Sequence, residues 1–123
     1  MDDSPYHAHI YFRPEERISA AMLHERFGRH PAILFVGAMI DRAIGPHPMA
    51  QFEIHFRARF AEDIIALIEP TNLRALIHPL TEDDFADHTS LAHWIGTPLT
   101  LDLSVLDPPG RNKGLARFGR RDF

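Results

Sequence analysis

The sequence predicts an α+β fold of the ferredoxin-like, split βαβ type, a sandwich with an antiparallel sheet and both helices on one face. Two observations predict it. The segments up to residue 78 follow the order strand, helix, strand, strand, helix, strand, which is the order of that fold. The length of 123 residues, with 45% hydrophobic and 24% charged residues, suits one globular domain.

The first predicted strand, residues 6–12, alternates strictly between two kinds of side chain. Successive side chains on a strand point to opposite faces. One face carries Ala8 and Ile10 among other apolar residues, and the opposite face carries His7, His9 and Tyr11. The first face suits a hydrophobic core, and the second carries groups that bind metals or transfer protons.

A helix and a second strand follow. Pro14 and the two glutamates after it suit a helix start, because proline fits the first turn and acidic groups favour the positive end of the helix dipole. Gly28 suits its end. Residues 32–40 are continuously apolar and predict a strand, within which Gly37 indicates a bulge or a close backbone approach.

The third strand is predicted at residues 51–57, where Glu53 and His55 alternate with apolar side chains. A second helix is predicted at residues 61–69, with apolar residues at helical spacing and Pro70 at its end. A fourth strand is predicted at residues 73–78. A short helix at 90–95 and an extra strand at 98–106, added to a sheet edge in this subunit or in a partner's, complete a domain over residues 1–106.

Residues 107–123 hold five of the 13 basic residues together with prolines and glycines. This composition predicts a loosely ordered basic tail.

The topology predicts that the histidines converge. Right-handed crossovers place the first strand between the third and fourth, antiparallel to both. The histidines of the first strand then lie beside His78 on one side, and beside Glu53 and His55 on the other. Parity places His7, His9, Glu53 and His55 on the face without helices, and in the fourth strand it groups His78 with Leu76 and Arg74.

Two histidines and one carboxylate on one face of a metal are the ligand set of non-haem Fe(II) oxygenases. The sharpest candidates here are His9, Glu53 and His78, with His7 and His55 as alternates. The competing interpretation is a set of polar residues on a solvated sheet face. His47, in a rigid turn between two prolines, and His88, which Asp87 could orient, are candidates for catalytic or supporting roles.

Composition excludes several classes. There is no cysteine, so disulfides, thiolate metal sites and a cysteine nucleophile are excluded. The net charge of −4 argues against a general nucleic-acid-binding surface. The N-terminus has no signal-peptide pattern, and no apolar run is long enough for a membrane span, so a cytoplasmic protein is expected. The uncovered sheet face suggests a homodimer.

The motifs in this order resemble the DOPA 4,5-dioxygenase family, a family of small enzymes that open aromatic rings. The resemblance covers roughly residues 6 to 106. It rests on the first strand, on Gly45-Pro46-His47-Pro48, Phe52-Glu53-Ile54 and Ile77-His78-Pro79-Leu80-Thr81, and on Asp87-His88-Thr89 with Trp94-Ile95-Gly96-Thr97-Pro98-Leu99.

The resemblance implies extradiol cleavage of a catechol such as DOPA by O2, with Fe(II) as the cofactor, for which zinc or nickel could substitute in a crystal. It implies His9, His78 and Glu53 as metal ligands, with His88 as a variant in place of Glu53. His47 and His88 would be acid/base or oxygen-stabilising groups.

Two other functions are considered. A non-enzymatic ferredoxin-like module that binds a metal or small ligand would have a closed metal shell and no oxygen uptake. A nucleic-acid-binding open sheet would need aromatic stacking residues and a basic face, which this sequence lacks.

Overall fold

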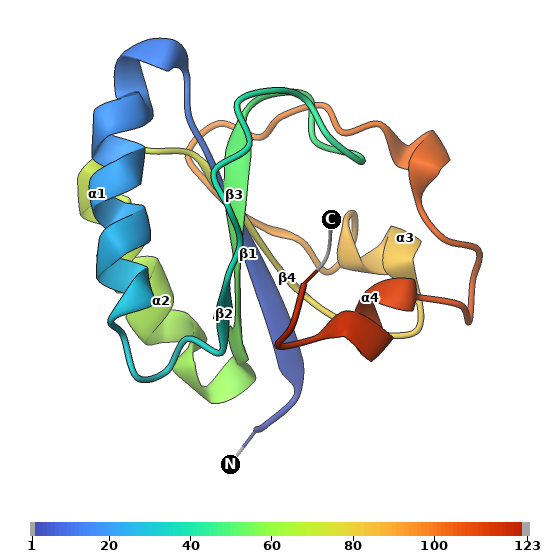
Figure 1. Ribbon diagram of the computed structural model, residues 1–123. Coiled ribbons are helices and arrows are strands. Elements are labelled where there is room, and N and C mark those ends of the chain that lie inside the picture. The colour runs from blue at the N-terminus through green and yellow to red at the C-terminus, as the bar shows by residue number, and fades with distance from the viewer. Residues whose placement is uncertain (1, 122–123) are drawn as a thin grey trace.

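The computed structural model describes residues 2–121, which form a five-stranded antiparallel sheet in the order β2-β3-β1-β4-β5 (Figure 1). The strands are β1 (Pro5–Tyr11), β2 (Phe35–Val36), β3 (Gln51–Arg57), β4 (Ala75–Pro79) and β5 (His93–Ile95). The first strand lies between the third and fourth, as predicted. The ferredoxin-like α+β prediction is therefore confirmed.

Two helices cover one face of the sheet, α1 (Arg17–Gly28) and α2 (Ala61–Ile68). Figure 1 shows both on the same side, where they pack on the apolar faces of β1, β3 and β4. The helix α1 follows a 3-10 turn at Pro14–Glu16, in which the Arg13 N–H donates to the Glu16 side chain at 2.9 Å. A 3-10 turn at Glu69–Thr71, with Pro70 in its first turn, follows α2. Both helices thus begin and end close to the predicted residues.

The strand register confirms the predicted convergence. In the sheet His7 lies opposite His55 on β3 and opposite His78 on β4, and His9 lies opposite Glu53. Ala8 lies opposite Ile54 and Ile77 on the core face. The two-residue period therefore separates an apolar layer from an imidazole layer across three adjacent strands.

The second strand is shorter than predicted, although the chain follows β3 beyond it. Separate backbone bonds join Leu34 N to His55 O at 2.8 Å and Gly37 N to Glu53 O at 2.8 Å. A Cβ at Gly37 would lie 3.1 Å from Glu53 Cγ, which confirms the predicted close approach. Only Phe35–Val36 keeps regular strand pairing.

The structure differs from the prediction after β4. Residues 93–95 form β5, paired with β4, instead of the end of a helix, because Trp94 and Ile95 suit a strand and Gly96 turns the chain at φ +77°. The predicted strand at 98–106 is wrong. Asp102 instead caps a 3-10 turn at Leu103–Val105 by accepting from Ser104 N. The short helix lies earlier, as α3 (Asp84–Asp87).

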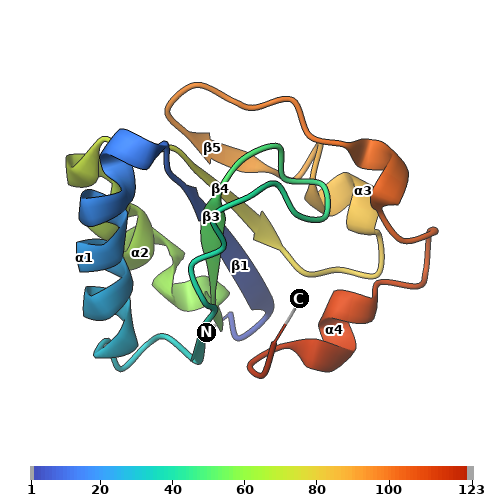
Figure 2. The ribbon, with the colours of Figure 1, turned by 45° about the horizontal axis from the view of Figure 1, so that its top comes forward.

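The face opposite α1 and α2 is covered by the chain itself. Figure 2 shows α3 and α4 (Lys113–Arg117) on this side of the sheet. The Asn112 side chain donates to Thr81 O at 2.7 Å, and Gly119 N donates to His55 Nδ1 at 2.9 Å. The structure thus differs from the prediction of a loosely ordered tail, because short-range caps and bonds to the sheet face order residues up to 121. Residues 122–123 lie outside the described part.

The sequence argument for a homodimer was an uncovered sheet face. Segments of the same chain cover that face in the described residues, so this argument no longer applies. None of the helices formed by residues 2–121 combines the length and the apolar character that a membrane span needs.

We expect Ile54→Ala to lower the free energy of unfolding by about 2–5 kcal/mol, because the side chain is fully buried in the central core and its removal leaves a cavity. Ile18→Ala is the matched control. Ile18 is 79% exposed on α1, and its loss should change the free energy by less than about 0.5 kcal/mol. Urea denaturation measures both. Equal destabilisation by the two substitutions would contradict the assigned core.

Candidate functional site

Six histidines are buried together on the sheet face opposite α1 and α2. Strands supply His7, His9, His55 and His78, the loop before β3 supplies His47, and the residue after α3 is His88. None is more than 9% exposed. The interpretation as polar residues on a solvated face is therefore wrong. Buried imidazoles need specific partners, because burial without a polar partner is unfavourable.

His9 and His78 face each other through their Nε2 atoms, which lie 3.0 Å apart. The other ring nitrogen of each donates a hydrogen bond to an oxygen. His9 Nδ1 donates to Gln51 Oε1 at 3.1 Å, and His78 Nδ1 donates to the Pro79 carbonyl at 2.7 Å. With these partners, a neutral imidazole carries its proton on Nδ1 and has a lone pair on Nε2.

Burial lowers the pKa of both His9 and His78 well below 6.5, and neighbouring histidines lower it further. Both rings are therefore neutral at pH 7. With this tautomer, two nitrogen lone pairs face each other at 3.0 Å, and a cation bound to both would relieve their repulsion. The pair is a candidate half of a metal-binding site.

His7 completes one candidate ligand group. One ligand atom from each of His7, His9 and His78 lies within 4.8 Å of the others. Two nitrogens 3.0 Å apart, each about 2.1 Å from a metal, subtend roughly 90° at the metal. This angle fits adjacent positions of an octahedral shell, and imidazole suits iron, zinc, copper and nickel. The residues present thus fit a divalent metal.

Glu53 lies in a second group, with His7 and His55, and not in the group of His9 and His78. Its Oε2 atom lies 3.6 Å from His7 Nδ1 and accepts from His55 Nε2 at 3.3 Å. Gly119 N donates to His55 Nδ1, which leaves the His55 proton on Nε2, facing the carboxylate. The predicted triad of His9, Glu53 and His78 is thus only partly assembled, and Glu53 is placed to orient His7.

His47 lies next to His9, with ring centroids 4.0 Å apart, so the structure brings this predicted residue into the cluster. Its Nδ1 accepts from the Tyr11 hydroxyl at 2.7 Å. Burial raises the Tyr11 pKa, which keeps the phenol protonated, and burial lowers the pKa of His47. A neutral His47 then has its proton on Nε2. Strand alternation predicted that Tyr11 shares a face with His7 and His9, but not that it would be the hydrogen-bond partner of His47.

His88 is oriented by Asp84, not by Asp87 as predicted. His88 Nδ1 donates to the Asp84 backbone oxygen at 2.8 Å and lies 3.3 Å from its carboxylate. Burial alone lowers the His88 pKa, but the contacts to Asp84 outweigh burial and raise it. Asp87 instead accepts from Thr81 and Asn112. The spacing of four residues between Asp84 and His88 was the available sequence signal.

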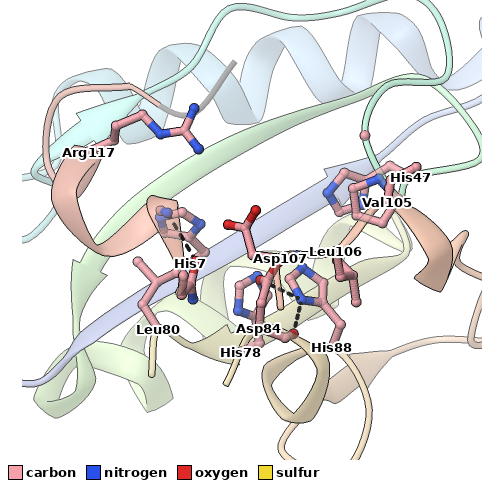
Figure 3. A pocket seen from close by; sticks show the side chains of 14 residues that line it. His7, His47, His78, Leu80, Asp84, His88, Val105, Leu106, Asp107 and Arg117 are labelled. Carbon is pink, nitrogen blue, oxygen red and sulfur yellow. Dashed lines mark hydrogen bonds and ion pairs between the residues drawn. The ribbon is translucent and has the colours of Figure 1, made fainter. Parts of the chain in front are cut away.

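A cavity of about 200 Å³ lies over these groups. Figure 3 shows His78, Asp84 and His88 close together, with His47 at one end and Arg117 at the other, near His7. The C-terminal segment, residues 107–121, supplies lining residues that were not predicted as site residues from the sequence. These are Asp107, Asn112, Gly114 and Arg117. The space suits a small ligand, because pockets for drug-sized molecules measure roughly 300–1,000 Å³.

Comparisons with known proteins agree with this architecture. The Dopa 4,5-dioxygenase family matches residues 6–105. An uncharacterized 21.2 kDa protein of Botryotinia fuckeliana is 35% identical over 114 residues, and a DOPA 4,5-dioxygenase of Amanita muscaria is 27% identical over 112 residues. Each alignment covers 82% of this chain, which spans 62% and 49% of the lengths of these relatives.

A solved structure has the same fold. The crystal structure of a candidate dioxygenase from Nostoc punctiforme superposes with a TM-score of 0.77 at 28% identity, covering 84% of this chain and 90% of that one. The family match extends from β1 to the 3-10 turn at Leu103–Val105 and includes every histidine of the buried cluster. The chain belongs to the DOPA 4,5-dioxygenase family.

Proposed function

We propose that this protein is an extradiol dioxygenase that opens the ring of a catechol such as DOPA, with Fe(II) as its cofactor. The observation that carries the proposal is the pair of neutral imidazoles, His9 and His78, whose Nε2 lone pairs converge at 3.0 Å. The family and the relative named as a DOPA 4,5-dioxygenase support the reaction class.

In this proposal His9, His78 and His7 hold the metal, and Glu53 orients His7. Bound Fe(II) would supply the centre at which the two catechol oxygens and O2 meet. Metal-binding histidines commonly donate their second N–H to an oxygen, which fixes the ring and its tautomer. His9 and His78 do this through Gln51 and Pro79.

His88 and His47 have different proton chemistry. His88 Nδ1 donates to Asp84, so its Nε2 is able to accept a proton from a catechol hydroxyl. The raised pKa of His88 makes it the better base of the two. His47 has its proton on Nε2 because Tyr11 donates to Nδ1, so it is able to donate to a developing oxygen anion. The proposed reaction transfers both atoms of O2 to the cleaved ring and yields a yellow semialdehyde.

The substrate expectation follows from size and burial. A cavity of about 200 Å³ suits a single aromatic ring with a short substituent. The C-terminal segment and α3 limit access of water to the histidines below, which strengthens electrostatic interactions in the site. A cytoplasmic location and a homodimer stay predictions of the sequence.

The direct test is oxygen uptake by Fe(II)-reconstituted protein given L-DOPA or catechol, with absorbance followed for a yellow product. We expect uptake by the natural sequence and by His93→Ala, because His93 is an exposed strand histidine. His78→Ala should lower the rate of oxygen uptake at least about 100-fold, since replacing a residue that only hydrogen-bonds to a metal ligand already costs about 10–100-fold. Bound metal without uptake for any catechol would favour the non-enzymatic binding module.

Metal content separates the roles of the histidines and Glu53. We expect His9→Ala and His78→Ala to lose stoichiometric metal, measured by elemental analysis after dialysis. Glu53→Gln should still bind one metal with affinity reduced about 10–100-fold, because its carboxylate lies beside His7 and outside the group of His9 and His78. Complete metal loss in Glu53→Gln would restore the triad predicted from the sequence.

The metal-free protein should lose stability as the pH falls below about 6.5. Burial lowers the folded-state pKa of His7, His9, His47 and His78, whereas the unfolded chain binds these protons near pH 6.5. The unfolded state therefore binds more protons, and each of these histidines reduces the free energy of unfolding by up to about 1.4 kcal/mol per pH unit. His88, with a raised pKa, acts in the opposite direction.

Urea titrations at pH 8, 7, 6 and 5 measure this slope. His47→Gln should show a shallower dependence, because it removes one of the four groups. A free energy of unfolding that stays constant between pH 7 and 5 would contradict neutral burial of the cluster.

A further inference from the structure

We propose that the C-terminal segment sets the substrate preference of this site, and that Arg117 binds a carboxylate carried by the aromatic ligand. The inference rests on the proposed function for the ring chemistry, but concerns binding. It assigns a specificity-determining role to a residue beyond the family match, which ends at residue 105.

One side of the cavity comes from the end of the chain. This C-terminal wall consists of Val105, Leu106, Asp107, Asn112, Gly114 and Arg117. The rest of the lining comes from the family-matched sheet and loops, and half of its residues are histidines. The groups proposed for ring chemistry thus lie within the matched region, while most of the wall that a substituent would contact lies outside it.

The C-terminal wall is held in place by specific hydrogen bonds. The Asn112 amide donates to Thr81 O at 2.7 Å and to Asp87 at 3.1 Å. Two residues after Arg117, the Gly119 N–H donates to His55 at 2.9 Å. These anchors lie on both sides of Arg117 along the chain, so α4 presents its side chains to the cavity in a defined position. A positioned group binds a ligand with a smaller entropic penalty than a mobile one.

Arg117 is the sole arginine or lysine among the described residues that line the cavity. His7 and His78 are neutral metal ligands in the proposed function, and His47 Nδ1 accepts from the Tyr11 hydroxyl at 2.7 Å. His88 is able to carry a charge, but Asp84 lies beside it. Apart from the metal of the proposed function, the guanidinium is therefore the permanently cationic side chain of this lining (Figure 3).

The carboxylates in the lining already accept hydrogen bonds. Asp84 accepts from Asp107 N at 2.9 Å, and Asp107 accepts from Lys113 N at 2.8 Å. Arginine has five N–H donors in a planar fork that matches a carboxylate, so it can bind a ligand while keeping another contact. The charges of this lining therefore favour an anionic substituent at Arg117. An ammonium substituent drawn to the two aspartates is the competing outcome.

The test uses three ligands of nearly equal shape, which are 3,4-dihydroxybenzoate, 4-methylcatechol and 3,4-dihydroxybenzylamine. Calorimetry without oxygen measures their binding to the metal-loaded full chain, so no turnover is needed. We expect the natural sequence to bind the benzoate at least about 10-fold more tightly than 4-methylcatechol, since hydrogen bonds between a guanidinium and a carboxylate are stronger than neutral ones.

Arg117→Met should abolish this preference and leave the affinity for 4-methylcatechol within about twofold. Arg117→Lys should keep part of the preference for the benzoate, because lysine keeps the positive charge but lacks the planar donors of the guanidinium. Arg120→Met is the matched control, an exposed arginine of the same segment, and should keep the full preference. Arg117→Lys also provides the comparison if Arg117→Met does not fold.

Equal binding of the benzoate and 4-methylcatechol by the natural sequence would overturn the proposal, as would tighter binding of the benzylamine. An equal loss for all three ligands in the Arg117 variants would also overturn it. Oxygen uptake is measured separately. A carboxylate preference without any ring cleavage would refute the proposed function alone, and cleavage without the preference would refute this inference alone.

Discussion

The burial of several imidazoles against one another is the constraint on which the rest of this structure depends. Six histidines share one sheet face with at most 9% exposure, and burial keeps four of them neutral. Neutral rings tolerate this proximity only if each nitrogen has a suitable partner. Backbone carbonyls, Gln51, Tyr11 and Asp84 supply oxygen partners, and the Nε2 atoms of His9 and His78 are left facing each other.

The two faces of the sheet have different roles. The apolar layer against α1 and α2 provides the cohesion of the domain. The imidazole layer contributes little apolar burial, and α3, α4 and the loop before β3 cover it. A covered site has a low dielectric and restricted water, which suits metal and proton chemistry. The two-residue period of β1, β3 and β4 thus places the residues that stabilise the domain on one face of the sheet and the candidate functional residues on the other.

The C-terminal segment covers the buried histidines and also contacts one of them directly. Phe118 stacks on His55 with ring centroids 5.6 Å apart, and Gly119 fixes the proton of that ring. His55 in turn donates to Glu53, which lies beside His7. A segment outside the family match therefore reaches a candidate metal ligand through one histidine and one carboxylate. Residues within the family match and residues beyond it therefore line the same cavity.

The sequence by itself determined the order of the elements, the position of β1 between β3 and β4, and the convergence of His7, His9, Glu53, His55 and His78. These follow from alternation and chain topology, which are local or combinatorial properties. Only the tertiary structure decided that β5 lies at residues 93–95, that the end of the chain folds over the histidines, and that Asp84 orients His88. It also decided that His7 lies in one candidate ligand group with His9 and His78, whereas the Glu53 carboxylate accepts a hydrogen bond from His55. Side-chain direction and long-range hydrogen bonds made these choices, because the same residues satisfy the same local patterns in either arrangement.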